Sequence, residues 1–218
     1  MTSRNTLVIL IMGVILLLGC TSISRVADGM FPEPTPTTNA TAEAYWRAYE
    51  QNIKYRELNA EIIATIPDSE LYPAALDIIW LKLKDRDDWQ QALREMPPGY
   101  TTIYYISWFE GAVNNGGYNQ YFSNSSGEYA VETLEALKLI GAKEIQANFE
   151  KAVAIHLAEA EDPRLQELYD DQTIESFMET YKYSSLGECD DEFYQLANLF
   201  GKYQAEFIRG NPELFTEK

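Results

Sequence analysis

Residues 108–127 of the chain read WFEGAVNNGGYNQYFSNSSG. An apolar, aromatic segment runs into an Asn-Asn-Gly-Gly sequence at 114–117, and a second run of small residues closes the stretch. Asn and Gly tolerate the left-handed backbone that often ends a helix. The stretch therefore predicts a buried helix that breaks at 114–117, one further helical turn over 118–122 and a loop after it.

The segments on both sides of this stretch carry apolar residues at helical spacing. The sequence IYYI at 103–106 favours a strand locally, but the apolar run shows no alternation, so we expect a buried helix. An apolar stripe from Tyr45 to Ile66 predicts helix up to Pro67. We expect the helix after the central stretch to end at Gly141, and Asp190 or Asp191 is a typical N-cap for the last helix. The sequence thus predicts an all-α fold, a single compact multi-helix bundle over 42–218.

The first 41 residues have the pattern of a lipoprotein signal followed by a tether. The aliphatic run LVILIMGVILLL at 7–18 has the length of a signal-peptide core. It leads into Leu-Gly-Cys, which resembles a bacterial lipobox. We expect a signal peptide over 1–19, lipidation of Cys20 and a Pro/Thr-rich tether over 20–41. The alternative is an uncleaved membrane anchor. Either way the domain would lie outside the cytoplasm, held to a membrane of the bacterial envelope.

The chain is strongly acidic, with a formal net charge of -17 at pH 7. Such a charge opposes direct binding to nucleic acid and favours cations or basic proteins. Carboxylates in rows on rigid helices can imitate the spacing of phosphates. The last third therefore offers a candidate surface for a basic protein, and a merely solvated surface with helix-capping acids is the alternative. The candidate residues there are Asp170, Asp171, Asp190, Asp191 and Glu192.

The polar side chains around the Gly-Gly pair make a second candidate site. In the functional interpretation, a ligand pocket among tyrosines is lined by Glu110, Asn114, Asn115, Asn119 and Gln120. In the structural interpretation these side chains satisfy buried backbone groups, while the glycines supply positive φ and the aromatic residues fill the core.

The sequence predicts no metal and no cofactor. The oxygen-rich run at 188–192 lacks the spacing of an EF-hand, although calcium stays a weaker alternative. Zinc needs several His or Cys ligands, and His156 is the single histidine. The sequence also lacks the G-x-S-x-G motif that would place a nucleophilic serine beside this histidine in a Ser/His catalytic system. Cys189 lies in an acidic run that disfavours its thiolate, although it can pair between chains, so an oligomer is one alternative.

The central stretch and the helix after it resemble a bacterial family named for a DNA-mimic protein and long catalogued as a domain of unknown function. The resemblance covers about 71–207. It implies an α-helical bundle, no known enzymatic activity and no cofactor. For the name-giving member it also implies an acidic surface that occupies a DNA-binding protein. The matching residues are Asn115, Gly116, Gly117, Gln120, Tyr121, Phe122, Asn124, Gly127, Ala136, Leu137, Ile140, Gly141 and Ala142.

These observations together indicate a non-enzymatic, membrane-tethered lipoprotein whose acidic domain binds another protein, with a basic partner favoured by the charge. Two alternatives stay open. One is a carboxylate-dependent hydrolase of envelope material that works through Glu110 or Asp191. The other is a structural lipoprotein without a discrete ligand.

Overall fold

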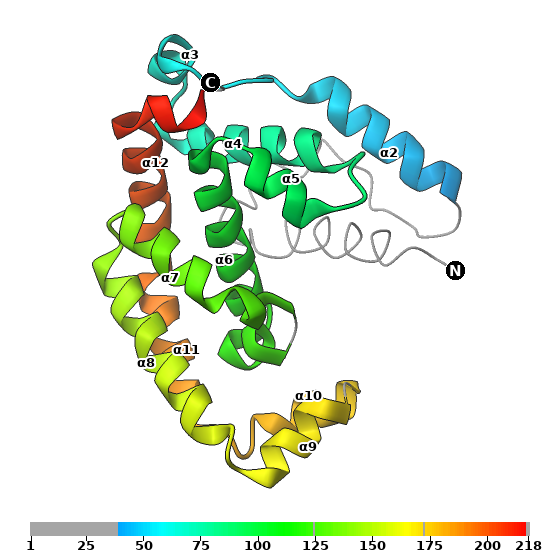
Figure 1. Cartoon of the computed structure of the whole chain (residues 1–218), viewed down its shortest axis with the longest axis vertical. Coiled ribbons are helices and arrows are strands. Elements are labelled where there is room, and N and C mark those ends of the chain that lie inside the picture. The colour runs from blue at the N-terminus through cyan, green and yellow to red at the C-terminus, as the bar shows by residue number, and fades with distance from the viewer. Residues whose placement is uncertain (1–38, 124, 172, 217–218) are drawn as a thin grey trace.

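The computed structural model describes residues 39–123, 125–171 and 173–216. The predicted signal peptide, Cys20 and most of the predicted tether lie outside the described residues. Within them the chain folds into helices and turns and contains no β-strand, which confirms the predicted all-α bundle (Figure 1). No described helix is both long enough and apolar enough to cross a membrane.

The described elements follow one another with short connections. In chain order they are α2 (Asn39–Asn52), α3 (Ala60–Thr65), α4 (Asp68–Leu83), α5 (Trp89–Glu95), α6 (Pro98–Ser123), η1 (Ser125–Tyr129), α7 (Ala130–Leu139), α8 (Lys143–Glu159), α9 (Pro163–Asp171), α10 (Ile174–Thr180), α11 (Gly187–Leu196), η2 (Ala197–Leu199), α12 (Phe200–Gly210) and η3 (Pro212–Phe215).

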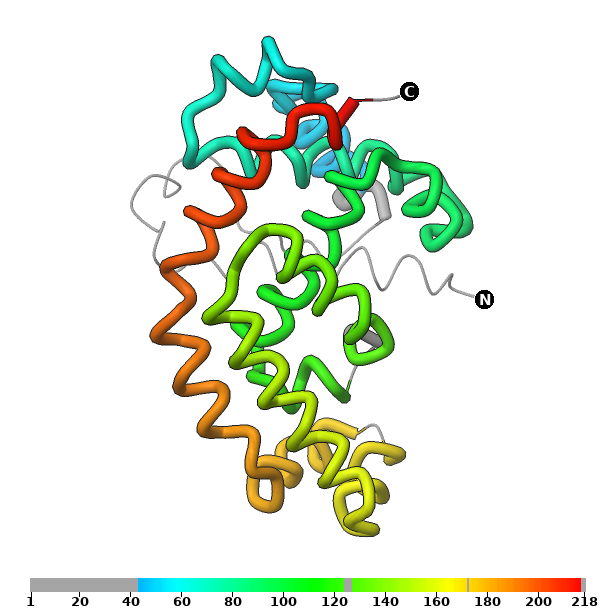
Figure 2. Tube along the Cα trace, turned by 60° about the vertical axis from the view of Figure 1, so that its left-hand side comes forward, coloured from blue at the N-terminus to red at the C-terminus, as the bar shows by residue number. Residues whose placement is uncertain are grey.

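Helix α6 lies at the centre of the bundle, as the sequence predicted. Its Phe109 is fully buried and lies in a cluster of aromatic rings whose centroids are all within 6.0 Å of its own. Several of these pairs meet edge to face, which aromatic rings prefer to a face-to-face sandwich. The partners, from α6, α8, α11 and α12, are Tyr118, Tyr121, Phe149, Phe193 and Phe200. Figure 2 shows α8 beside the α11–α12 segment along the length of the molecule.

Helix α2, the first described helix, packs on α4 through aromatic and charged side chains. The ring of Trp46 stacks on that of Trp80 with centroids 4.6 Å apart. Lys84 Nζ lies 3.2 Å from Glu50 Oε1. These contacts join the first described helix to the bundle.

The prediction of continuous helix from Tyr45 to Ile66 was wrong. Helix α2 ends at Asn52, and α3 begins only at Ala60. The intervening segment still buries Leu58, whose N–H donates to the hydroxyl of Tyr100 at 3.1 Å. Asn59 then caps α3 by accepting a hydrogen bond from the Ile62 N–H at 2.9 Å. Apolar spacing alone cannot distinguish such a buried loop from a helix.

The predicted start of the last helical segment was also wrong. Helix α11 begins at Gly187, so Asp190 lies inside the helix and does not cap it. The predicted end of α7 is confirmed, because Gly141, which follows the C-cap residue Ile140, has a φ of +74°. The Gly141 N–H bonds to the Lys138 carbonyl and the Ala142 N–H to the Leu137 carbonyl, each at 3.1 Å. This is the Schellman arrangement, in which the left-handed residue is usually glycine.

Candidate functional site

Helix α6 is kinked at its Gly-Gly pair, where the sequence predicted a break. Gly116 is extended, with a φ of −163°, and Gly117 is left-handed, with a φ of +64°. The carboxyl group of Asp190, from α11, lies directly against Gly117. A Cβ atom at position 117 would be 2.4 Å from Asp190 Oδ2, so only glycine leaves room for this carboxyl group.

Asp190 caps the helical turn that follows the kink. Its Oδ1 accepts a hydrogen bond from the N–H of Tyr118 at 2.7 Å, which satisfies a donor that the broken helix leaves without a partner. Asp190 is only 9 % exposed. Burial raises the pKa of its carboxyl group, against the opposing effect of the Tyr118 hydrogen bond. Among the five acidic candidates, Asp190 therefore has a structural role, because it is buried and caps the helical turn after the kink.

Two tyrosines bond to carbonyl groups at the kink. The hydroxyl of Tyr194 donates to the Val113 carbonyl at 3.0 Å, and the hydroxyl of Tyr181 donates to the Gly116 carbonyl. A kink interrupts the regular hydrogen bonds of a helix, and the carbonyl groups that it frees need other donors. Helices α10 and α11 and the segment between them therefore help to hold the bent shape of α6.

Asn148, in α8, connects the kinked segment to α11 and was not a predicted site residue. Its Oδ1 accepts from the Tyr118 hydroxyl at 2.6 Å. Its Nδ2 donates to the Cys189 carbonyl and to Glu192 Oε2, both at 3.1 Å. Asn148 is 1 % exposed and lies in the apolar stripe of its helix. A polar residue inside such a stripe is a signal in the sequence that points to a buried hydrogen-bond network.

The predicted ligand-pocket residues bond to different partners. Asn115 Nδ2 donates to Gln120 Oε1 at 2.9 Å. Asn119 is buried, and its Oδ1 accepts from the hydroxyl of Tyr169 at 3.2 Å. Asn114 is half-buried. The polar side chains around the kink are thus used largely within the bundle.

Glu110 connects α6 to other helices. Its Oε2 accepts from Gln204 Nε2, in α12, at 3.0 Å, and it also bonds to Tyr72 in α4. Burial raises the pKa of its carboxyl group, against the effect of these two hydrogen bonds. Its recorded partners are neutral side chains, and none of them is Asp191.

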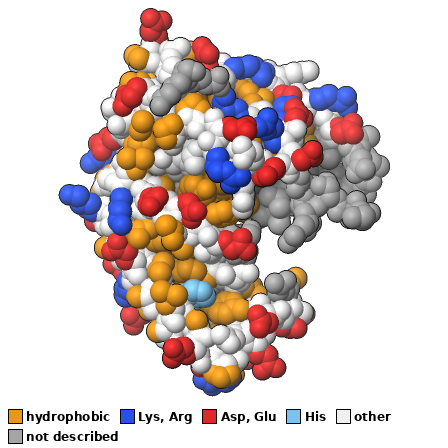
Figure 3. Space-filling view, in the orientation of Figure 1, with side chains coloured by type: hydrophobic (Ala, Val, Ile, Leu, Met, Phe, Trp, Pro, Cys, Tyr) orange, Lys and Arg blue, Asp and Glu red, His pale blue; other side chains and the backbone are white. Residues whose placement is uncertain are grey.

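The other acidic candidates are exposed. Asp170 and Asp171 end α9, and Asp191 lies on the solvent side of α11. Glu192 is also exposed and shares Lys151 with Glu188, at 3.7 and 3.9 Å. We refer to the exposed acidic side chains of α9–α11 as the acidic end. Figure 3 shows acidic groups at the lower end of the molecule, where α9 and α10 lie, as well as elsewhere on the same face.

His156 is half-buried, whereas Cys189 lies inside the fold. The His156 ring stacks on Phe122 at a centroid distance of 4.1 Å, and burial lowers its pKa. Cys189 is fully buried in α11, and burial raises the pKa of its thiol. Within residues 39–123, 125–171 and 173–216, no group of three His, Cys, Asp or Glu side chains is placed to hold a metal ion.

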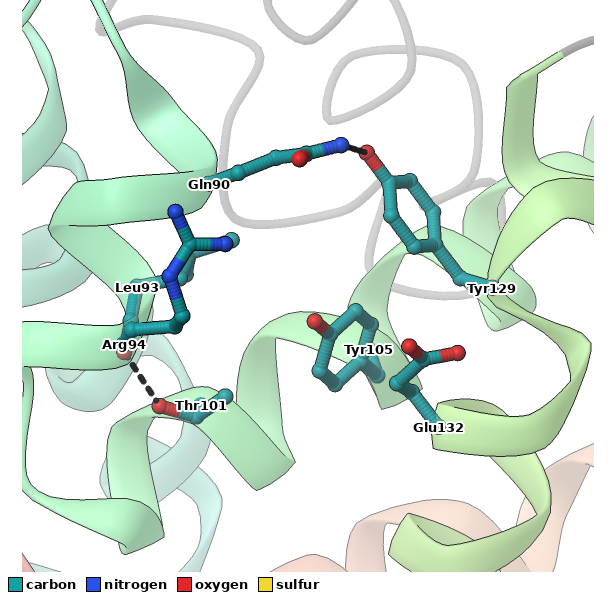
Figure 4. Close-up of a pocket in the computed structure, with 7 residues that line it drawn as sticks. All are labelled: Gln90, Leu93, Arg94, Thr101, Tyr105, Tyr129 and Glu132. Carbon is teal, nitrogen blue, oxygen red and sulfur yellow. Dashed lines mark hydrogen bonds between the residues drawn. The ribbon is translucent and has the colours of Figure 1, made fainter.

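A cavity of about 210 Å³ lies between α5, α6, η1 and α7 (Figure 4). The ring centroids of Tyr105 and Tyr129 are 5.5 Å apart in its wall. Arg94 and Glu132 carry its charges, from α5 and α7. The amide of Gln90 donates to the hydroxyl of Tyr129 at 3.3 Å. Leu93 and Thr101 complete the lining. None of these seven residues was predicted as a site, because they come from four segments with no shared motif.

These observations define a class of protein. It is acidic and all-α, and its central helix bends at a Gly-Gly pair. The sequence model of DMP19-like proteins matches residues 94–211, from α5 to the end of α12. This match spans more than half of the 218 residues, and the chain belongs to the family of DMP19-like proteins. The predicted resemblance to the DNA-mimic family is thereby confirmed. No curated protein and no solved structure gives a match.

Proposed function

We propose that this chain is a non-enzymatic, membrane-anchored lipoprotein whose acidic end binds a basic protein. Membership of the DMP19-like family supports the non-enzymatic role. The observation that carries the binding role is the charge of α9–α11. Residues 163–196 hold nine acidic and two basic residues, a formal net charge of −7. A surface of this sign attracts a basic protein and speeds its association.

Neighbouring cations leave much of this charge uncompensated. Lys182 pairs with Glu179, and Lys151 lies near Glu188 and Glu192. Asp170, Asp171 and Asp191 make no ion pair within the described part of the chain. Asp190 is excluded from the proposed surface because its carboxyl group is buried against Gly117.

A triple variant, Asp170→Asn, Asp171→Asn and Asp191→Asn, tests the binding role. It should lose the proteins that the wild-type domain captures from an envelope extract, and raising the salt should release the same proteins from the wild type. The control variant, Glu43→Gln, Glu57→Gln and Glu135→Gln, makes the same change in net charge elsewhere and should keep them. If raised salt and the acidic-end variant both leave the set of captured proteins unchanged, the electrostatic proposal is wrong.

The lipid anchor has its own test. Cells expressing the full chain and its Cys20→Ser variant would be fed a fatty acid that carries a detectable tag. We expect label on the wild-type chain alone, and we expect only that chain to enter the detergent phase on phase separation. Equal labelling of both chains would remove Cys20 as the site of lipidation.

A further inference from the structure

We propose that the cavity between α5, α6, η1 and α7 binds a small zwitterion of the α-amino-acid class, a binding activity beyond the proposed protein-binding role. The opposite charges of the lining suggest this ligand. Arg94 and Glu132 lie on opposite sides of Tyr105 (Figure 4). Glu132 makes no ion pair or hydrogen bond within the described residues, and Arg94 bonds only to the neutral Gln91 there.

The two charged side chains match the two ends of a zwitterion. A guanidinium offers paired N–H donors that fit a carboxylate, so Arg94 suits the carboxylate of the ligand. The carboxylate of Glu132 suits its ammonium group. Both charges act on the Tyr105 hydroxyl, since Glu132 raises the pKa of this group and Arg94 lowers it, after the larger raising effect of burial. The hydroxyl therefore lies within the electrostatic reach of both.

The rest of the lining suits an aromatic side chain. The tilted rings of Tyr105 and Tyr129 offer faces and edges to a third ring. The volume of about 210 Å³ is below the roughly 300–1,000 Å³ of pockets for drug-sized ligands. A single aromatic amino acid matches this size, and a longer peptide would extend beyond the cavity.

The test titrates the folded domain with L-phenylalanine and follows the amide resonances of Leu93, Thr101 and Tyr129 by NMR. We expect saturable shifts at these residues. Glu132→Gln and Arg94→Gln should each weaken binding by about tenfold or more, because each removes one charge-assisted contact. The control variants Glu135→Gln, on the same helix as Glu132, and Arg47→Gln, on α2, should bind as the wild type does.

Two derivatives of the probe identify which end each residue holds. N-acetyl-L-phenylalanine lacks the ammonium group, so Glu132→Gln should not weaken its binding further. L-phenylalanine amide lacks the carboxylate, so Arg94→Gln should not weaken its binding further. The absence of saturable shifts, or equal affinity in the wild type and both cavity variants, overturns the proposal. Retained circular dichroism and melting temperature in each variant show that the domain is folded.

Discussion

Gly117→Ala is the sharpest test of how the kink in α6 is built. The substitution adds one methyl group at a residue with a φ of +64° and a ψ of −170°. This region of backbone conformation is almost restricted to glycine. The new Cβ would also lie 2.4 Å from Asp190 Oδ2. We expect the variant to be destabilised by both effects.

The magnitude follows from these two contributions. A residue held in a disfavoured backbone conformation costs on the order of 1–3 kcal/mol. Displacing the Asp190 carboxyl group leaves the Tyr118 N–H without its acceptor, at about 1–3 kcal/mol. Gly117→Ala should therefore lower the free energy of unfolding by about 2–6 kcal/mol, a large fraction of the roughly 5–15 kcal/mol of a native domain.

Urea denaturation at pH 7, followed by circular dichroism, measures this loss. Gly201→Ala is the matched control, because Gly201 is helical and a Cβ there meets nothing within 4 Å. It should change stability by no more than about 1 kcal/mol, in the stabilising direction. Asp190→Ala should partly rescue Gly117→Ala, since it removes the clash. A Gly117→Ala variant within about 1 kcal/mol of the wild type, or strictly additive effects of the two substitutions, would refute the reasoning.

Three further substitutions test other contacts. Burial raises the pKa of the Glu110 carboxyl group in the folded state. The contribution of Glu110 to stability is therefore full below the pKa of the unfolded state, and it is lost as the pH rises through the pKa of the folded state. Glu110→Gln should thus be near neutral at pH 4 and stabilising at pH 7.5 in urea denaturation, and a loss of stability that grows with pH would contradict this. Asn148→Ala leaves the buried Tyr118 hydroxyl without its partner and should cost about 1–3 kcal/mol, whereas the exposed Asn198→Ala should cost little. Gly141→Ala should lower stability by about 1–2 kcal/mol for its positive φ alone, and a Gly210→Ala control should show no such loss by the same measurement.

The sequence was sufficient for the features that depend on local chemistry. Asn and Gly at 114–117 indicated the break in α6, and Gly141 indicated the end of α7, because a left-handed backbone is a local requirement. The all-α fold followed from the spacing of apolar residues. Resemblance at the Gly-Gly stretch pointed to the correct family.

Features that depend on distant partners could not be predicted. Leu58 continues an apolar stripe, yet it lies in a loop that is held by the hydroxyl of Tyr100. Asp190 carries the residue type of a helix cap, and it does act as a cap, but for a turn 72 residues earlier in the chain. The cavity beside Tyr105 needs α5, α6, η1 and α7 to be in place before its residues meet.

The bond between Asp190 and Tyr118 also limits when the domain can complete its fold, because the two residues are 72 positions apart in the chain. A chain that emerges N-terminus first, from a ribosome or across a membrane, presents the Gly-Gly segment well before α11. Until α11 and α12 follow, the ring of Phe109 lacks its partners Phe193 and Phe200. The emerging domain is then most exposed to aggregation, and a chaperone that shields α6 would act in this interval.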